Sequence, residues 1–263
     1  FRHEAVNEHS REWEFRDSSG YSMPHNPEAL EVIYNLKSDN AISSNHMEMY
    51  AQDTWRRESS KGIFSLNYGM RFSYWSWNKE WLLSPRASLT FIPKNHDNMT
   101  FRLATGLYYQ RPFYKELKDT ITNGATTIVQ LNQDIQSQRS FQLIAGYEYR
   151  FKIGKRPFLF ATELYYKAQD RLNPYTVDNT KIVYYGRNCA TGNVLGADFK
   201  LYGEFVPGTD SWLTFSLMRA RMDINSKNIP QPTDQAWSLN MFFSDYFPNT
   251  TRWKMNLKAC FAG

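Results

Sequence analysis

The sequence predicts an all-β chain that forms part of an antiparallel transmembrane β-barrel of the outer-membrane type, with about ten or eleven strands. Aromatic residues make up 16% of the chain, yet the mean hydropathy is −0.62, so rings and polar residues are closely interleaved. Long segments alternate between apolar and polar residues, and the connections between them alternate between short and long. A hydrophobic content of 41% is too high for a disordered chain. No apolar run is long enough for a transmembrane helix.

The charges do not indicate a nucleic-acid partner. The chain has 31 basic and 26 acidic residues, a net charge of +5, and its Lys and Arg residues are scattered rather than gathered in a stripe. Two cysteines are too few for a disulfide scaffold or a multi-cysteine zinc site.

The alternation predicts strands that are longer than those of soluble proteins. Within the segment 63–74, residues 64–74 place only apolar side chains on one face and only small, polar or charged ones on the other. A tilted membrane-spanning strand needs about 9 to 11 residues plus its ends, whereas soluble strands average about 5 to 6. The same pattern recurs near residues 42–57, 62–77, 80–92, 98–109, 138–152, 157–169, 194–205, 211–223, 235–247 and 250–262.

The connections indicate which end of the barrel faces outward. Short turns rich in Gly, Pro, Asn and Asp lie near 58–62, 93–98, 154–157, 207–210 and 248–250. They alternate with the long segments 110–137, 170–193 and 224–234, and the short link at 77–80 is the exception. Outer-membrane barrels have short periplasmic turns and long external loops. Residues 1–41 are less periodic, and we expect them, with their stretches 11–17 and 20–24, to form a long external loop after an earlier strand.

Both faces of the predicted strands fit a membrane barrel. The apolar face ends in rings typical of aromatic girdles: Trp55, Tyr74, Trp75, Trp77, Tyr109, Trp237 and Phe247. Charged residues on the other face are tolerated only where they meet water or a partner. They either hydrate the wall or, as we favour, hold a plug domain: Arg71, Arg86, Arg102, Glu148, Arg150, Glu163, Lys167, Asp198, Lys200 and Glu204.

No constellation predicts catalysis, a cofactor or a metal site. His3, Glu4, Glu8 and His9 do not form a zinc-binding His-Glu-x-x-His motif, because Asn7 stands where the second histidine is required. Cys189 has no neighbouring histidine, so a catalytic thiol is not predicted. A disulfide bond between Cys189 and Cys260 is left open.

Several segments, in order along the chain, resemble strand motifs of TonB-dependent receptors. The resemblance covers the whole of residues 1–263 and rests on the following stretches: Met49–Trp55 (MYAQDTW), Tyr68–Phe72 (YGMRF), Ser84–Leu89 (SPRASL), Thr105–Phe113 (TGLYYQRPF), Glu163–Lys167 (ELYYK) and Gly203–Gly208 (GEFVPG).

The resemblance implies a barrel of about 22 strands in the cell outer membrane, closed by an N-terminal plug. It also implies the partners: outer-membrane lipid, the receptor's own plug domain, the periplasmic TonB energy-coupling protein and, as a further candidate, a surface lipoprotein. On this interpretation residues 1–263 are a partial barrel domain, and the plug and the last strands are absent from the chain.

The predicted function is that of a receptor whose external loops bind a scarce solute for import through the plugged barrel. Siderophore, cobalamin, peptide and glycan remain equal candidates for the solute. Two alternatives stay open: a complete ten-stranded outer-membrane barrel enzyme, and a barrel with an assembly or structural role. The candidate ligand contacts lie at the start of segment 110–137 and in the next long loop: Tyr108, Gln110, Arg111, Phe113, Tyr114, Tyr175 and Tyr184.

Overall fold

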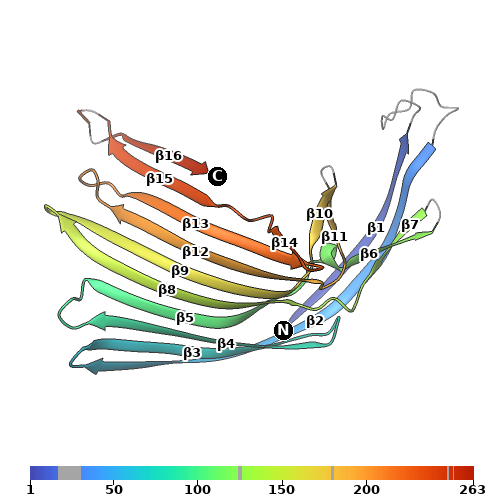
Figure 1. Ribbon diagram of the computed structural model, residues 1–263, viewed down its shortest axis with the longest axis horizontal. Helices are drawn as coiled ribbons and strands as arrows, with labels where there is room; N and C mark the ends of the chain where they lie inside the picture. Colours follow the sequence, from blue (N-terminus) through green and yellow to red (C-terminus); the bar gives the residue numbers. More distant parts are fainter. Residues whose placement is uncertain (17–30, 124–125, 179–180, 248, 251) are drawn as a thin grey trace.

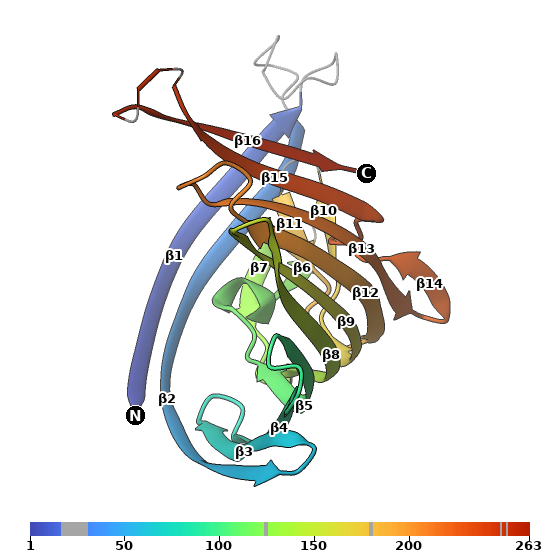
Figure 2. The ribbon, with the colours of Figure 1, turned by 90° about the vertical axis from the view of Figure 1, so that its left-hand side faces the viewer.

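A computed structural model describes residues 1–16, 31–123, 126–178, 181–247, 249–250 and 252–263. The chain forms one strongly curved 14-stranded sheet, in which the neighbouring barrel strands are antiparallel (Figure 1). Seen from the end with the short turns, the sheet curves into an open trough and is not a closed barrel (Figure 2). Within the described residues, no helix is long and apolar enough to cross a membrane.

Every strand predicted from the alternation is present. Their boundaries differ from the prediction by a few residues, except that β2 begins well before residue 42. The barrel strands are β2 (Glu31–Ser59), β3 (Gly62–Trp75), β4 (Glu80–Pro93), β5 (Met99–Gln110), β8 (Gln138–Ile153), β9 (Arg156–Leu172), β12 (Ala190–Gly203), β13 (Ser211–Ile224), β15 (Trp237–Tyr246) and β16 (Lys254–Ala262).

The prediction of a loop over residues 1–41 is wrong where the structure describes this segment. Strand β1 (Arg2–Arg16) pairs with the first half of β2, from Arg2 opposite His46 to Arg16 opposite Glu31. The second half of β2 pairs with β3 instead. The stretch 20–24 lies outside the described residues.

The long connections also contain regular structure that the sequence pattern did not reveal. Segment 110–137 holds a short 3-10 helix, η2 (Tyr114–Leu117), and the hairpin β6 (Lys118–Asn123) with β7 (Thr126–Leu131). Strand β7 pairs in parallel with residues 36–38 of β2. The following connections hold β10 (Tyr175–Asp178), β11 (Lys181–Tyr184) and β14 (Lys227–Pro230).

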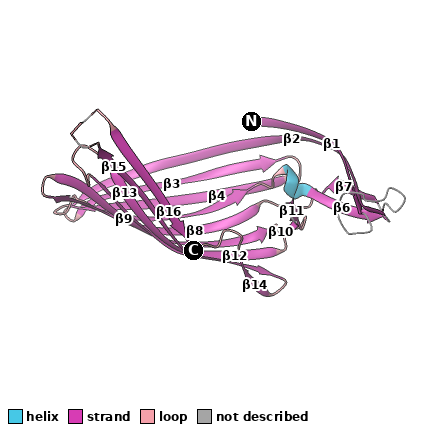
Figure 3. Cartoon of the chain, turned by 90° about the horizontal axis from the view of Figure 1, so that it is seen from above, coloured by secondary structure: helices cyan, strands magenta, loops and turns pink. Residues whose placement is uncertain are grey.

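The predicted asymmetry of the two ends is confirmed. The short turns gather at one end of the sheet, and β6, β7, β10, β11 and β14 gather at the other, with the upper part of β1 and β2 (Figures 1 and 3). At the short-turn end, β8 and β9 are joined through Gly154, whose φ of 64° lies in the left-handed region that glycine adopts without strain.

Cross-strand register shows that the two faces of the sheet differ in chemistry. One row of partners runs across one face and is polar or small throughout: Arg56, Ser65, Thr90, Arg102, Gly146, Glu163, Asp198, Ser216 and Ser238. The row beside it, on the opposite face, is mostly aromatic: Phe64, Phe91, Phe101, Tyr147, Thr162, Phe199, Phe215 and Leu239.

The aromatic row forms a belt on the outer face that is interrupted at Thr162. The Phe64 and Phe91 ring centroids are 4.5 Å apart, and those of Phe101 and Tyr147 are 5.1 Å apart. Apolar side chains above the belt are exposed, with Leu103 at 48% and Leu164 at 56%. Because the outer face is the apolar one, lipid rather than water is its natural solvent.

The girdle prediction is wrong for Trp75. Tyr74 faces outward and packs against Trp81, with ring centroids 4.3 Å apart. Trp75, one residue later in the strand, therefore faces inward, where it is 5% exposed and its Nε1 donates to Ser44 Oγ at 3.3 Å. Trp77 packs against the same inward cluster.

Arginine substitutions test the assignment of the faces. Leu103→Arg places a charge on the lipid face of β5, where it costs about 2 to 4 kcal/mol near the bilayer midplane. Ala104→Arg places the same charge on the inward face. We expect strong loss of folded receptor in outer-membrane fractions for Leu103→Arg and near-normal yield for Ala104→Arg. Leu66→Arg and Asn67→Arg form a second pair, and equal yields within both pairs would contradict the assignment.

Candidate functional site

The external end of the sheet is covered by a cap, defined here as the described residues of 76–79, 111–137 and 173–189. The cap shares an apolar core with the strands beneath it, formed by Ile42, Trp75, Leu117 and Ile135, each at most 5% exposed. Ile42 and Trp75 are inward-facing residues of β2 and β3. The long connections therefore fold over the inner side of the sheet rather than away from it.

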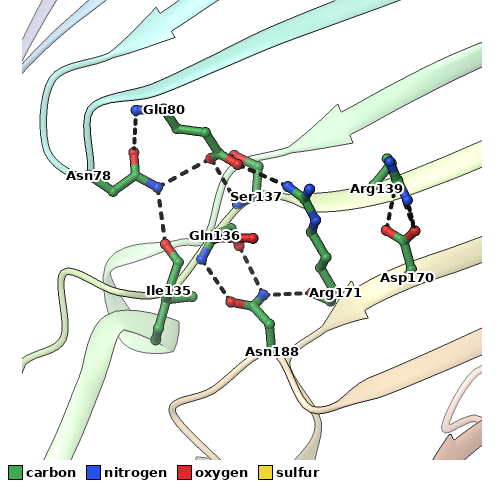
Figure 4. A network of polar contacts seen from close by, with 9 residues as sticks. All are labelled: Asn78, Glu80, Ile135, Gln136, Ser137, Arg139, Asp170, Arg171 and Asn188. Carbon is green, nitrogen blue, oxygen red and sulfur yellow. Dashed lines mark hydrogen bonds and ion pairs between the residues drawn. The ribbon is translucent and has the colours of Figure 1, made fainter.

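Glu80 joins the strand ends beneath the cap (Figure 4). Its carboxylate accepts hydrogen bonds from Ser137 N at 3.0 Å, from Ser137 Oγ at 2.7 Å and from Asn78 Nδ2 at 3.2 Å. Arg171 Nη1 lies 3.4 Å from the other carboxylate oxygen. The side chain of Glu80 is only 12% exposed, so this anion is well shielded and its hydrogen bonds are costly to lose.

Amide side chains connect the two long segments of the cap. Asn188 Nδ2 donates to the carbonyls of Gln136 at 3.0 Å and Arg171 at 2.6 Å, and Gln136 N donates to Asn188 Oδ1 at 2.7 Å (Figure 4). Asn132 Nδ2 donates to the Gly186 carbonyl at 3.0 Å, and Asn173 Nδ2 to that of Glu116 at 3.1 Å. These bonds satisfy backbone carbonyls in segments that lack regular partners.

Glu8 on β1 holds the cap from the side. It accepts hydrogen bonds from Tyr114 Oη at 2.5 Å and Ser38 Oγ at 2.8 Å, and it forms an ion pair with Lys118. Burial alone would raise the pKa of Glu8, but these hydrogen bonds, with Lys118 foremost, outweigh it and lower the pKa. Burial, together with the bond to Glu8, raises the pKa of Tyr114.

Glu116 fixes the turn at the start of the cap. Its carboxylate accepts from Phe113 N at 2.8 Å, and Gln138 Nε2 donates to it at 3.3 Å. Glu116 is 5% exposed, and burial raises its pKa from the ordinary value.

The predicted ligand contacts fall into separate places. Tyr108 lines a cavity of about 530 Å³ on the inner face of β2–β5, where the Arg86 guanidinium lies 4.4 Å from the centroid of its ring. Arg111, Phe113 and Tyr114 line a smaller cavity of about 270 Å³ at the start of the cap. Gln110 is exposed at the end of β5 and lines neither cavity.

Tyr175 and Tyr184 are cross-strand partners in the β10–β11 hairpin, with ring centroids 5.6 Å apart. They line neither of the two cavities. Their role as ligand contacts stays a prediction.

Sequence reasoning missed several residues of the smaller cavity. Arg2, Glu4 and Val6 come from β1, which was expected to be a loop, and Trp75 was placed on the opposite face. Inward-pointing Glu4, Val6 and Glu8 are half-buried, while His3 and His9 are exposed on the other face of β1. Burial thus alternates along β1 and separates the histidines from the carboxylates, but both faces are mostly polar, so the sequence pattern offers little sign of the strand.

Most of the predicted plug-facing charges lie on the inner wall. Arg102 pairs with Glu148 at 2.7 Å, Arg150 Nη2 lies 3.5 Å from Glu148, and Arg71 lies 4.0 Å from Glu48. Several of the remaining cations lie over tyrosine rings on the same wall: Arg86, Lys167 and Lys200.

The remaining acidic positions differ in their surroundings. Glu163 and Asp198 are direct cross-strand neighbours on the inner wall. Glu204 instead lies in the turn after β12, where it accepts a hydrogen bond from Gly208 N at 2.5 Å. Cys189 and Cys260 are both free thiols. In the described part of the chain, no group of three or more His, Cys, Asp or Glu residues could hold a metal ion.

Comparison with known proteins decides the family. The family model described as TonB dependent receptor-like, beta-barrel, matches residues 5–263. The chain belongs to the TonB-dependent receptor β-barrel family. This is a family of receptor and transporter barrels of the outer membrane, not a family of enzymes.

A solved structure shows the same fold as this TonB-dependent receptor barrel. The outer membrane transporter YddB from Escherichia coli matches with a TM-score of 0.54 and 13% sequence identity, over 91% of this chain. The match covers 35% of the transporter, so the chain spans about a third of its length. No curated protein sequence matches significantly.

Removing the Glu80 carboxylate should loosen the cap. In Glu80→Ala, the Ser137 and Asn78 donors lose their acceptor at a cost of about 1 to 3 kcal/mol. We expect amide hydrogen exchange in 111–137 and 173–189 to accelerate about 5- to 150-fold. In Asp170→Ala, which removes only the partner of Arg139, acceleration should stay confined to the ends of β8 and β9. Unchanged exchange of the cap in Glu80→Ala would contradict the role given to this residue.

Acid should release the cap from β1. Because the pKa of Glu8 is lowered in the folded protein, its stabilising contribution is complete above the ordinary value of 4.5. That contribution is lost as the pH falls below 4.5 through the lowered pKa. The protection of amides 114–118 against hydrogen exchange, taken relative to the intrinsic exchange rate at each pH, should therefore fall in the native receptor as the pH drops below 4.5. In Glu8→Gln this protection should already be low at neutral pH and should lack this step. A step of equal size in Glu8→Gln would show that another group is responsible.

Proposed function

We propose that this chain forms the wall and external cap of an outer-membrane receptor that captures a scarce solute from outside. The solute is then imported past a displaced plug, driven by the periplasmic TonB protein. The observation that carries this proposal is the inward fold of the cap. A cap that only extended the wall would pack on outward-facing residues, whereas this one packs on the inward Ile42 and Trp75.

The inner wall supports the presence of a plug. Charged side chains such as Arg71, Arg86, Glu163 and Asp198 lie on the inner wall of the trough, and Arg71 and Arg86 also line the cavity of about 530 Å³ on the β2–β5 side. A wide barrel with such a wall either conducts water or is filled, and large outer-membrane transporters have a plugged lumen. The chain spans about a third of the length of the related transporter. The plug domain and the TonB protein are therefore proposed here as partners of the barrel wall.

The orientation in the membrane can be tested by thiol labelling of the full-length receptor in intact cells. Ile121, 48% exposed on β6, and Lys155, exposed in the β8–β9 turn, lie at opposite ends. With Cys189 and Cys260 replaced by serine, we expect Ile121→Cys to react with a membrane-impermeant maleimide in intact cells. Lys155→Cys should react only after lysis. The reverse pattern would contradict the proposed orientation.

The plugged lumen can be tested by conductance. The full-length receptor reconstituted in planar bilayers should show almost no ion current, and deletion of the segment that precedes the barrel should open a large, stable conductance. Equal conductance of both proteins would contradict a plugged import barrel. It would favour instead a barrel with a purely structural role.

A further inference from the structure

The cavity of about 270 Å³ at the start of the cap has the features of a binding site for a small ring-bearing anion. Its floor is the apolar core of the cap, with Ile42 and Trp75 at 5% and Leu117 at 1% exposure. Val6 and Tyr114 pack against this floor. Such a floor is rigid and apolar, which suits a hydrophobic ring rather than a strongly hydrated group.

The rim adds positive charge. Arg2 and Arg111 line the cavity together with a single carboxylate, Glu4. Burial lowers the pKa of Arg111, which means that its guanidinium is partly removed from water. Its guanidinium lies over the Trp75 ring, 5.9 Å from Cζ to the centroid; Glu4 and Glu48 attract it electrostatically, but within the described residues no hydrogen bond or ion pair joins it to either carboxylate. A desolvated guanidinium without an acceptor favours a carboxylate, which matches its planar donor geometry.

Phe113 supplies the second half of the site. Its side chain lines the cavity and is 64% exposed, an unusual position for a large apolar ring on the external side. The backbone at this point is held, because Phe113 N donates to Glu116 and Glu116 N donates to the Phe113 carbonyl at 2.9 Å. The ring is therefore presented by a fixed turn, so that little ordering has to accompany binding.

We propose that this cavity binds an aromatic carboxylate, either free or as the acidic terminal group of a larger solute. The ring lies between Phe113 and the apolar floor, and the carboxylate accepts hydrogen bonds from Arg111, with Arg2 adding charge. The inference rests on the proposed function, since it takes the cap as the place of solute capture. The volume, just below that of sites for drug-sized ligands, limits the bound group to about one ring with its substituents.

The test uses the full-length receptor in detergent and 4-fluorobenzoate as the probe, with binding followed by ¹⁹F NMR line broadening. We expect saturable binding of 4-fluorobenzoate and at least about tenfold weaker binding of the uncharged 4-fluorobenzamide. Heat-modifiable mobility on gels shows for each variant that the barrel is folded.

The variants separate the contributions of charge and ring. Arg111→Gln should weaken binding of 4-fluorobenzoate about tenfold or more, and Phe113→Ala about 2- to 12-fold. Lys115→Gln removes an exposed charge from the same turn without lining the cavity, so binding should change by less than about twofold. Glu4→Gln should tighten binding, because it removes the carboxylate that lines the cavity beside the two arginines.

Three results would overturn the proposal. They are equal binding of 4-fluorobenzamide, equal effects of Arg111→Gln and Lys115→Gln, and displacement of the probe by inorganic phosphate at the same concentration as by benzoate. None of them depends on transport. A failure here would leave the conductance and labelling results of the proposed function intact.

Discussion

The structure depends on one constraint: in lipid, every backbone N–H and C=O group must find a partner within the protein. Neighbouring barrel strands meet this need by long antiparallel ladders, such as the one that runs without interruption from Arg139 opposite Asp170 to Ile153 opposite Arg156. Once such a ladder is fixed, the period of two along each strand fixes both faces. The aromatic belt and the polar inner wall follow from the same register, because each is a row of cross-strand partners and the two rows are one residue apart along every strand.

Strand β2 links this wall to the external cap. It is 29 residues long, or about 95 Å at the usual rise, which far exceeds the width of a membrane. Its lower half pairs with β3, and its upper half lies between β1 and β7. Inward residues of this one strand therefore line both cavities. Ile42 and Ser44 line the cavity of about 270 Å³ at the cap, and Tyr50 and Gln52 line the cavity of about 530 Å³ on the inner face. Strand β2 thus forms one continuous inward-facing wall from the cavity at the cap to the cavity in the trough.

The membrane-spanning strands could be predicted because lipid imposes an apolar residue at every second position. The prediction failed where that condition ends. Strand β1 lies beside the upper part of β2, and its outward residues are mostly polar or charged, with Ala5 and Trp13 as exceptions, so the contrast between its two faces is weak. Trp75 was misplaced for a related reason, since a ring at a strand end indicates an interface but does not show which face it occupies. The bonds from Ser137 to Glu80 and from Gln138 to Glu116 connect residues more than 20 positions apart, and no local pattern indicates them.

The central claim is that alternate residues of each barrel strand face lipid and lumen, and β5 offers the most direct test. Single cysteines at each position from 101 to 108 of the full-length receptor, with Cys189 and Cys260 replaced, can carry a bimane fluorophore in vesicles containing nitroxide-labelled lipid. The account predicts strong quenching at 101, 103, 105 and 107 and weak quenching at the positions between them. Quenching in the opposite phase, or without a period of two, would contradict it.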